Sequence, residues 1–100
     1  MEVRHADDKL ARIEAEPGYN GGLDNRLVRA FRKVMNIIRT VANEGELYHW
    51  KSLHFEKLKG NRSHQRSLRL VHQWRLIMEI ENRSGVNNNL CVVIAIEDYH

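Results

Sequence analysis

The spacing of apolar residues changes once along this 100-residue chain, from the period of a helix to the period of a strand. Between Asp24 and Gly45 the apolar residues recur at helical spacing, which predicts a helix with one buried stripe. From Gln65 they alternate with polar residues, which predicts strands with one buried face. The residues of the helical stripe are Leu27, Phe31, Val34, Met35, Ile38 and Val41.

The first half of the chain is predicted to hold a short strand and two helices. The strand spans Glu2 to His5. Asp7 has the chemistry of an N-cap for the first helix, which Pro17-Gly18 ends. Asp24 can cap the second helix, and Gly45 is its natural stop.

The second half is predicted to hold three strands joined by turns. A first strand begins at Gln65, His72-Gln73 is the turn into the next strand, and an apolar run forms the last strand. The order strand, helix, helix, strand, strand, strand predicts an α+β domain, with two N-terminal helices packed on one face of a small antiparallel sheet. The remaining predicted segments are a helical turn at 46–50, a basic connection at 51–62, a polar hairpin loop at 82–89 and the apolar run at 90–96.

Length and composition predict one domain, residues 1–100, with a modest core. The first eight residues are too charged for a signal peptide, and no apolar run approaches the ~18 residues of a membrane span. We therefore expect a cytoplasmic protein. The single cysteine, Cys91, lies inside the last apolar run, where a thiol most often acts as a small core residue.

Positive charge is concentrated in residues 51–75, which carry +6 although the whole chain carries only +3. Such a cluster attracts anions and indicates a phosphate-rich partner. The alternative is a solvated basic face without a partner. The basic residues of this segment are Lys51, Lys57, Lys59, Arg62, Arg66, Arg69 and Arg75.

The last three residues, Asp98-Tyr99-His100, place an acid, a phenol and an imidazole directly after the last predicted strand. That strand would hold the three groups at the rim of the sheet. They are candidates for proton transfer, because an imidazole titrates near neutral pH. The alternative is an inert polar tail.

Four segments together resemble the HigB-type toxins of the RelE/ParE superfamily, over roughly residues 54–100. The resemblance implies the toxin of a type II toxin-antitoxin pair that cleaves messenger RNA on the ribosome and is neutralised by a small helix-turn-helix (HigA-like) antitoxin. The same fold is implied, with a basic concave face opposite the helices. The segments are Lys57-Leu-Lys-Gly-Asn-Arg62, Ser67-Leu-Arg69, Gln73-Trp-Arg75 and Glu97-Asp-Tyr-His100.

The resemblance also implies a role for individual residues. Arg75 and Lys59 would stabilise charge on the phosphorus, and His100 would transfer a proton. Asp98 would orient His100 or act as a base, and Tyr99 would stack on a base or donate a hydrogen bond. The other expected RNA-binding residues are His54, Lys57, Arg62, Arg66 and Arg69.

One position departs from the family pattern. Several HigB-like toxins have a histidine four residues before the glycine of the Lys-Gly turn, where this chain has Glu56, and His54 lies two residues earlier. A carboxylate can act as a general base. The residue that takes the proton is therefore His54, Glu56 or His100.

The expected reaction needs no metal in principle, because the nucleophile is the substrate's own 2′-hydroxyl. The six histidines and one cysteine show no paired metal-ligand spacing, so we expect neither a metal nor a cofactor. Two rival functions remain: a ParE-like inhibitor of DNA gyrase, and a non-catalytic module of the same fold that binds RNA or protein. A helix-turn-helix antitoxin in the neighbouring reading frame would favour the toxin.

Overall fold

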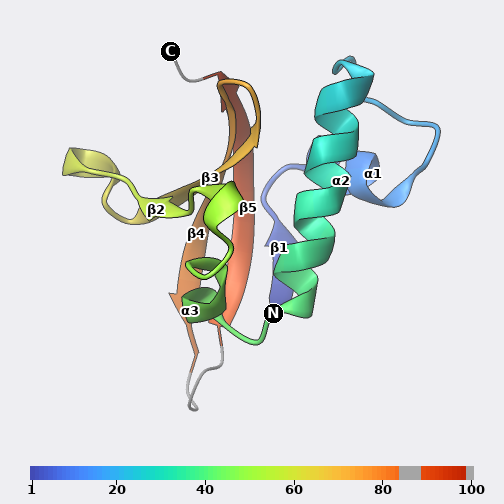
Figure 1. Cartoon of the computed structure of the whole chain (residues 1–100). Coiled ribbons are helices and arrows are strands. Elements are labelled where there is room, and N and C mark those ends of the chain that lie inside the picture. Colours follow the sequence, from blue (N-terminus) through green and yellow to red (C-terminus); the bar gives the residue numbers. More distant parts are fainter. Residues whose placement is uncertain (84–88, 99–100) are drawn as a thin grey trace.

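The computed structural model describes residues 1–83 and 89–98. Its core element is a five-stranded sheet, and helices α1 (Asp8–Ala15) and α2 (Asn25–Thr40) cover one face of it (Figure 1). The predicted α+β fold, with two N-terminal helices on one side of the sheet, is confirmed.

The strand order in the sheet is β1-β5-β4-β3-β2. Neighbours from β2 to β5 are antiparallel, whereas β1 pairs with β5 in parallel, so the prediction of a wholly antiparallel sheet is wrong for β1. Nearly the whole chain separates β1 from β5, and no hairpin therefore fixes their relative direction. The strands are β1 (Glu2–His5), β2 (Glu56–Lys57), β3 (Gln65–Val71), β4 (Trp74–Asn82) and β5 (Asn89–Asp98).

Both predicted N-caps are present. The carboxylate of Asp7 accepts a hydrogen bond from the backbone N–H of Lys9, and that of Asp24 accepts one from Arg26, each at 2.8 Å. These bonds satisfy amides that a helix start leaves unpaired. Within the described ranges no helix is long and apolar enough to cross a bilayer.

Helix α2 ends at Thr40, before the predicted stop at Gly45, which lies instead in the short helix α3 (Glu44–Leu47). The chain becomes extended at Val41, with ψ 152°. The ammonium group of Met1 donates to the backbone carbonyls of Arg39 and Val41. A tertiary contact from the far end of the chain therefore satisfies carbonyls at this helix end, which local sequence does not reveal.

The segment 51–62, predicted as a connection, contains strand β2 and two short 3₁₀ helices, η1 (Lys51–Leu53) and η2 (Gly60–Arg62). Strand β2 has only two residues, too few for a period of two to be detected. Its pairing with β3 adds the outermost strand of the sheet (Figure 1). The predicted turn at His72-Gln73 is confirmed, and part of the predicted loop at 82–89 lies outside the described residues.

The core lies between the helices and the sheet. The apolar stripe of α2 is buried, as predicted, and packs on alternate residues of β3, β4 and β5. Cys91 is fully buried in this layer. The most deeply buried members are Ile13, Phe31, Met35, Ile38, Leu47, Leu68, Leu76, Met78, Cys91 and Val93.

Candidate functional site

The face of the sheet opposite the helices carries polar side chains from four strands. Residues paired across neighbouring strands share a face. Glu56 pairs with Ser67, and Arg75 of β4 pairs with Glu97 of β5. Together with Arg62 from η2, these residues define what we call the open face.

Arg75 is fixed at the centre of the open face. Its Nε donates to Ser67 Oγ at 3.0 Å, and an Nη donates to the carbonyl of His54 at 2.7 Å. Glu56 Oε1 lies 3.5 Å from the same nitrogen. Only 14% of the Arg75 side chain is exposed, and Ser67 is fully buried. Arg75 therefore links β3 to the segment that leads into β2.

His54 adopts a left-handed backbone conformation, with φ 47°, at the end of η1. This conformation is unusual for a residue with a side chain. The hydrogen bond from Arg75 to its carbonyl stabilises the turn, so Arg75 also shapes the chain from which His54 and Glu56 project.

Arg62 reaches over the open face from η2. Its guanidinium donates to both carboxylate oxygens of Glu97, at 3.1 and 2.9 Å, and its Nε donates to Gln65 Oε1 at 2.8 Å. A two-point contact of this kind fixes the guanidinium plane as well as its position. The side chains of the pair are 38% and 36% exposed, so solvent and solutes reach it.

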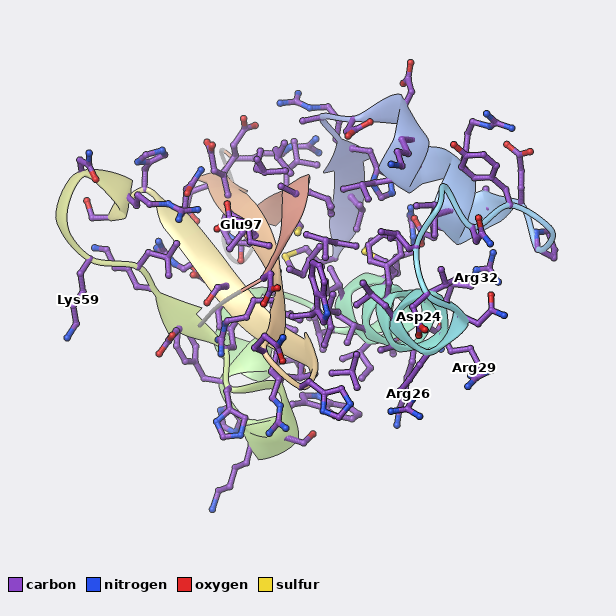
Figure 2. The ribbon with its side chains drawn as sticks, turned by 90° about the horizontal axis from the view of Figure 1, so that it is seen from above. Asp24, Arg26, Arg29, Arg32, Lys59 and Glu97 are labelled. Atoms are coloured by element: carbon purple, nitrogen blue, oxygen red, sulfur yellow. The ribbon has the colours of Figure 1, made fainter. Side chains whose placement is uncertain are left out.

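A hollow of about 390 Å³ lies beside this pair, between β2 and η2. Lys59 projects from its outer rim, away from the sheet and far from the arginines of α2 (Figure 2). Within the described ranges no ion pair involves Lys57 or Lys59. The hollow is lined by Glu56, Lys57, Leu58, Lys59 and Arg62.

A family model of HigB-like toxins, described as the RelE-like toxin of the type II toxin-antitoxin system HigB, matches residues 4–98. The chain belongs to this family. Membership makes the protein a type II toxin and implies an antitoxin as its partner. None of the curated proteins compared with the chain matches it.

A solved structure with the same fold is the YoeB/ParE toxin from Agrobacterium tumefaciens. It is 16% identical to this HigB-like toxin, with a TM-score of 0.59, and the match covers 100% of both chains. At this identity the likeness establishes the RelE/ParE fold alone.

The toxin's predicted site residues do not all lie together. The structure brings Glu56, Lys59, Arg62 and Arg75 to the open face and its adjoining hollow, with Lys57 at the rim. His54 contacts this group through its backbone carbonyl, which accepts from Arg75. Among the residues that the structure describes, no group of three His, Cys, Asp or Glu side chains is placed to hold a metal ion.

Two predicted RNA-binding arginines have other surroundings. Arg66 forms an ion pair with Glu44 of α3 at 2.6 Å, and its side chain is only 19% exposed. The geometry therefore favours a structural role for Arg66 over contact with RNA. Arg69 is a register partner of Arg75, but it lines a separate groove beside α2.

The C-terminal residues are placed only in part. Asp98 pairs with Trp74, which puts it on the face of the sheet opposite to its neighbour Glu97, and its side chain is exposed. Tyr99 and His100 lie outside the described residues.

Sequence reasoning missed Glu97 as a member of the site. Its position in the strand contained the signal: Leu76 and Ile96 are paired and face the core, so their neighbours Arg75 and Glu97 face the other way. The sequence does not fix the β4–β5 register, and only this register shows that Glu97 lies beside Arg75.

Proposed function

We propose that this HigB-like toxin is a ribosome-dependent endoribonuclease that cleaves messenger RNA at the open face. The observation that supports the proposal best is the hollow beside Arg62. There Lys57 and Lys59, which have no ion-pair partners in the described ranges, lie next to the carboxylate of Glu56. Cations that neutralise a phosphate and groups that move a proton are the two requirements of RNA cleavage.

The reaction we propose is attack of the 2′-hydroxyl on the adjacent phosphorus. The bond to the 5′-oxygen of the next nucleotide breaks as the new P–O bond forms. The 2′-hydroxyl gives its proton to a base, and the leaving oxygen receives a proton. The products are a 2′,3′-cyclic phosphate and a 5′-hydroxyl.

Arg75 and Lys59 stabilise the negative charge of the transition state in this proposal. Arg75 is held by Ser67 and the His54 carbonyl, so little reorganisation is needed when charge develops. Lys59 is exposed and can approach a phosphate that enters the hollow. Lys57 and Arg62 contribute to binding of the RNA backbone.

Three groups are candidates for the proton transfers. Glu56 lies within 3.5 Å of Arg75, and His54 is exposed two residues before it. His100 is the third candidate, with Asp98 and Tyr99 as its proposed supporting groups. Separate variants distinguish them: Glu56→Gln, His54→Gln and deletion of His100.

The proposed partners are a helix-turn-helix (HigA-like) antitoxin, the 70S ribosome and its messenger RNA, and the proposed location is the cytoplasm. Expression of the toxin alone should stop growth, and co-expression of the protein from the adjacent reading frame should restore it. Ribosomes programmed with a defined message, followed by primer extension and end-group analysis, test the cleavage directly.

A matched pair of variants makes the assay specific. Lys59→Ala should lower the cleavage rate at least about 100-fold, the scale typical of removing a transition-state cation. Arg29→Ala, on the far side of the molecule in Figure 2, should cleave like the wild type. Cleavage products with 5′-phosphate ends would contradict the mechanism. Inhibition of purified DNA gyrase without RNA cleavage would favour the ParE-like alternative.

A further inference from the structure

A second hollow lies on the helix side of the sheet, away from the open face. It is a groove of about 310 Å³ between α2 and the edge formed by η1 and the end of β3. Its floor is aliphatic and its rim is basic. The floor consists of Ala30, Val34, Ile37, Leu53, Leu70 and Val71, and the rim of Arg26, Lys33, Trp50, Ser52 and Arg69.

The cations of the groove differ from most arginines of the molecule. Seven arginines form ion pairs with glutamates, but over residues 1–83 and 89–98 no ion pair involves Arg26, Lys33 or Arg69. The Arg26 guanidinium hydrogen-bonds to the ring of His72, at 3.2 Å. No residue of the lining is acidic. An acidic ligand would therefore complement the groove.

Trp50 gives the groove an apolar anchor point. Among residues 1–83 and 89–98 it is one of two large hydrophobic side chains that are strongly exposed, with 46% of Trp50 and 51% of Tyr48 accessible. Trp50 also borders a neighbouring hollow with Thr40 and His49. Exposed tryptophans are enriched at the energetic centres of protein interfaces.

The aliphatic floor favours a protein ligand over RNA. Val34, Ile37 and Leu70 offer no hydrogen bonds to a base edge or a sugar, whereas they match Leu, Ile or Val side chains of a peptide. The groove follows α2 from Arg26 to Ile37, which at a rise of about 1.5 Å per residue is about 16 Å, or roughly three helical turns.

We propose that this groove is the docking site for an acidic, amphipathic helix of the antitoxin. The apolar side of that helix packs on the aliphatic floor and against Trp50, and its carboxylates pair with Arg26, Lys33 and Arg69. The inference rests on the proposed function for the identity of the partner, and it places that partner on the helix side of the sheet.

The test uses the full-length toxin and the full-length protein encoded beside it, after that protein has been shown to restore growth. The variant Arg26→Glu/Lys33→Glu reverses two rim charges, and Trp50→Ala removes the anchor. The control Lys9→Glu reverses one charge at an exposed position on α1, outside the groove, and so makes half the charge change of the double variant. Affinities are measured by calorimetry, and thermal melts establish that each variant is folded.

We expect the double variant and Trp50→Ala each to weaken binding at least about 30-fold, as loss of an interface hot spot does, with Lys9→Glu unchanged. Cleavage of RNA by the double variant should stay at the wild-type rate. An unchanged affinity of both folded groove variants for a neutralising antitoxin would overturn the docking site and leave the proposed function intact. Loss of RNA binding in place of antitoxin binding would also overturn it. If no adjacent protein restores growth, the docking site and the toxin function both fail.

Discussion

The Arg62 guanidinium on η2 and the Glu97 carboxylate on β5 face each other across the open face, joined by two hydrogen bonds at 3.1 and 2.9 Å. Helix η2 connects β2 to β3, and β4 lies between β3 and β5 in the sheet order. A phosphate that enters the hollow beside Arg62 meets a cation whose charge is already shared with a carboxylate. If RNA binds at the open face as we propose, Glu97 competes with it for this arginine.

The first prediction is that Glu97→Gln tightens RNA binding. Loss of the competing charge lets Arg62 neutralise a phosphate, so the slope of log K against log salt for a single strand should become more negative by about 0.7. For the wild type we expect a slope of roughly −3 to −5, and Lys57→Ala should reduce its size by about one unit. Fluorescence anisotropy with a labelled single-stranded RNA measures these slopes.

The control for this experiment is Glu81→Gln, which breaks the exposed ion pair with Arg4. It changes the net charge as Glu97→Gln does but leaves Arg62 paired with Glu97, so its salt slope should stay close to that of the wild type. An equal effect of both substitutions would show that net charge alone, and not the contact with Arg62, controls the affinity. The stability cost of Glu97→Gln should be small, ~0–1 kcal/mol, because the pair is well solvated.

The second prediction concerns the buried hydroxyl of Ser67, which receives its hydrogen bond from Arg75. Arg75→Ala leaves that hydroxyl unpaired and removes the support of the His54 carbonyl, so it should cost roughly 1–3 kcal/mol of stability as well as activity. Ser67→Ala in the same chain should recover part of the loss, because both partners are then absent. Urea denaturation of the two single variants and the double variant measures the coupling.

Arg83→Ala is the matched control, since it removes an arginine from an exposed pair with Glu2. Its free energy of unfolding should stay within about 0.5 kcal/mol of the wild type. Additive losses for Arg75→Ala and Ser67→Ala would mean that the two side chains do not act together.

Much of the fold could be predicted from the sequence because it depends on local signals. Asp7 and Asp24 cap helices through bonds to amides two residues later, and the apolar stripe of α2 repeats at 3.6 residues. What could not be predicted depends on contacts between distant segments. Met1 bonds to the end of α2, and β1 lies parallel to β5.

The candidate site shows the same division. The basic segment and its resemblance to HigB-type toxins indicated Lys59, Arg62 and Arg75. The pairing of Glu97 with Arg62 and of Glu44 with Arg66 depends on strand register and on where α3 packs. Counting charges along the sequence therefore overstated how much of the +6 in residues 51–75 is available to RNA.

The third prediction is a loss of stability in acid that depends on Glu14. The hydrogen bond from Arg39 lowers the pKa of Glu14 below its ordinary value of 4.5; burial opposes the shift, and His5, at 2.7 Å, adds to it. A carboxylate with a lowered pKa stabilises the fold fully above the ordinary value, and this contribution disappears as the pH falls through the folded-state pKa. Glu14→Gln should therefore be less stable than the wild type at pH 7, and the difference should shrink below about pH 4.5.

Thermal melts from pH 7 to pH 3 test this prediction, with Glu81→Gln as the control at an exposed ion pair. A constant difference between Glu14→Gln and the wild type across that range would mean that the packing of residue 14, and not its charge, stabilises the contact of α1 with α2.

The last prediction is that the Cys91 thiol is inert in the folded toxin. Burial raises its pKa to about 12, so almost no thiolate, the reactive form, exists at neutral pH. The sulfur packs against Met78 Sδ at 3.6 Å in the fully buried layer between sheet and helices. A colorimetric disulfide reagent at pH 8 should therefore modify the thiol at the rate of global unfolding in native buffer, and immediately in 6 M guanidinium chloride.

Rapid modification in native buffer, with the thermal melt unchanged, would mean that β5 separates locally from its neighbours. Because β5 also carries Glu97, such opening would disturb the candidate site. Across a temperature series, the rate of RNA cleavage should then fall as the rate of thiol modification rises.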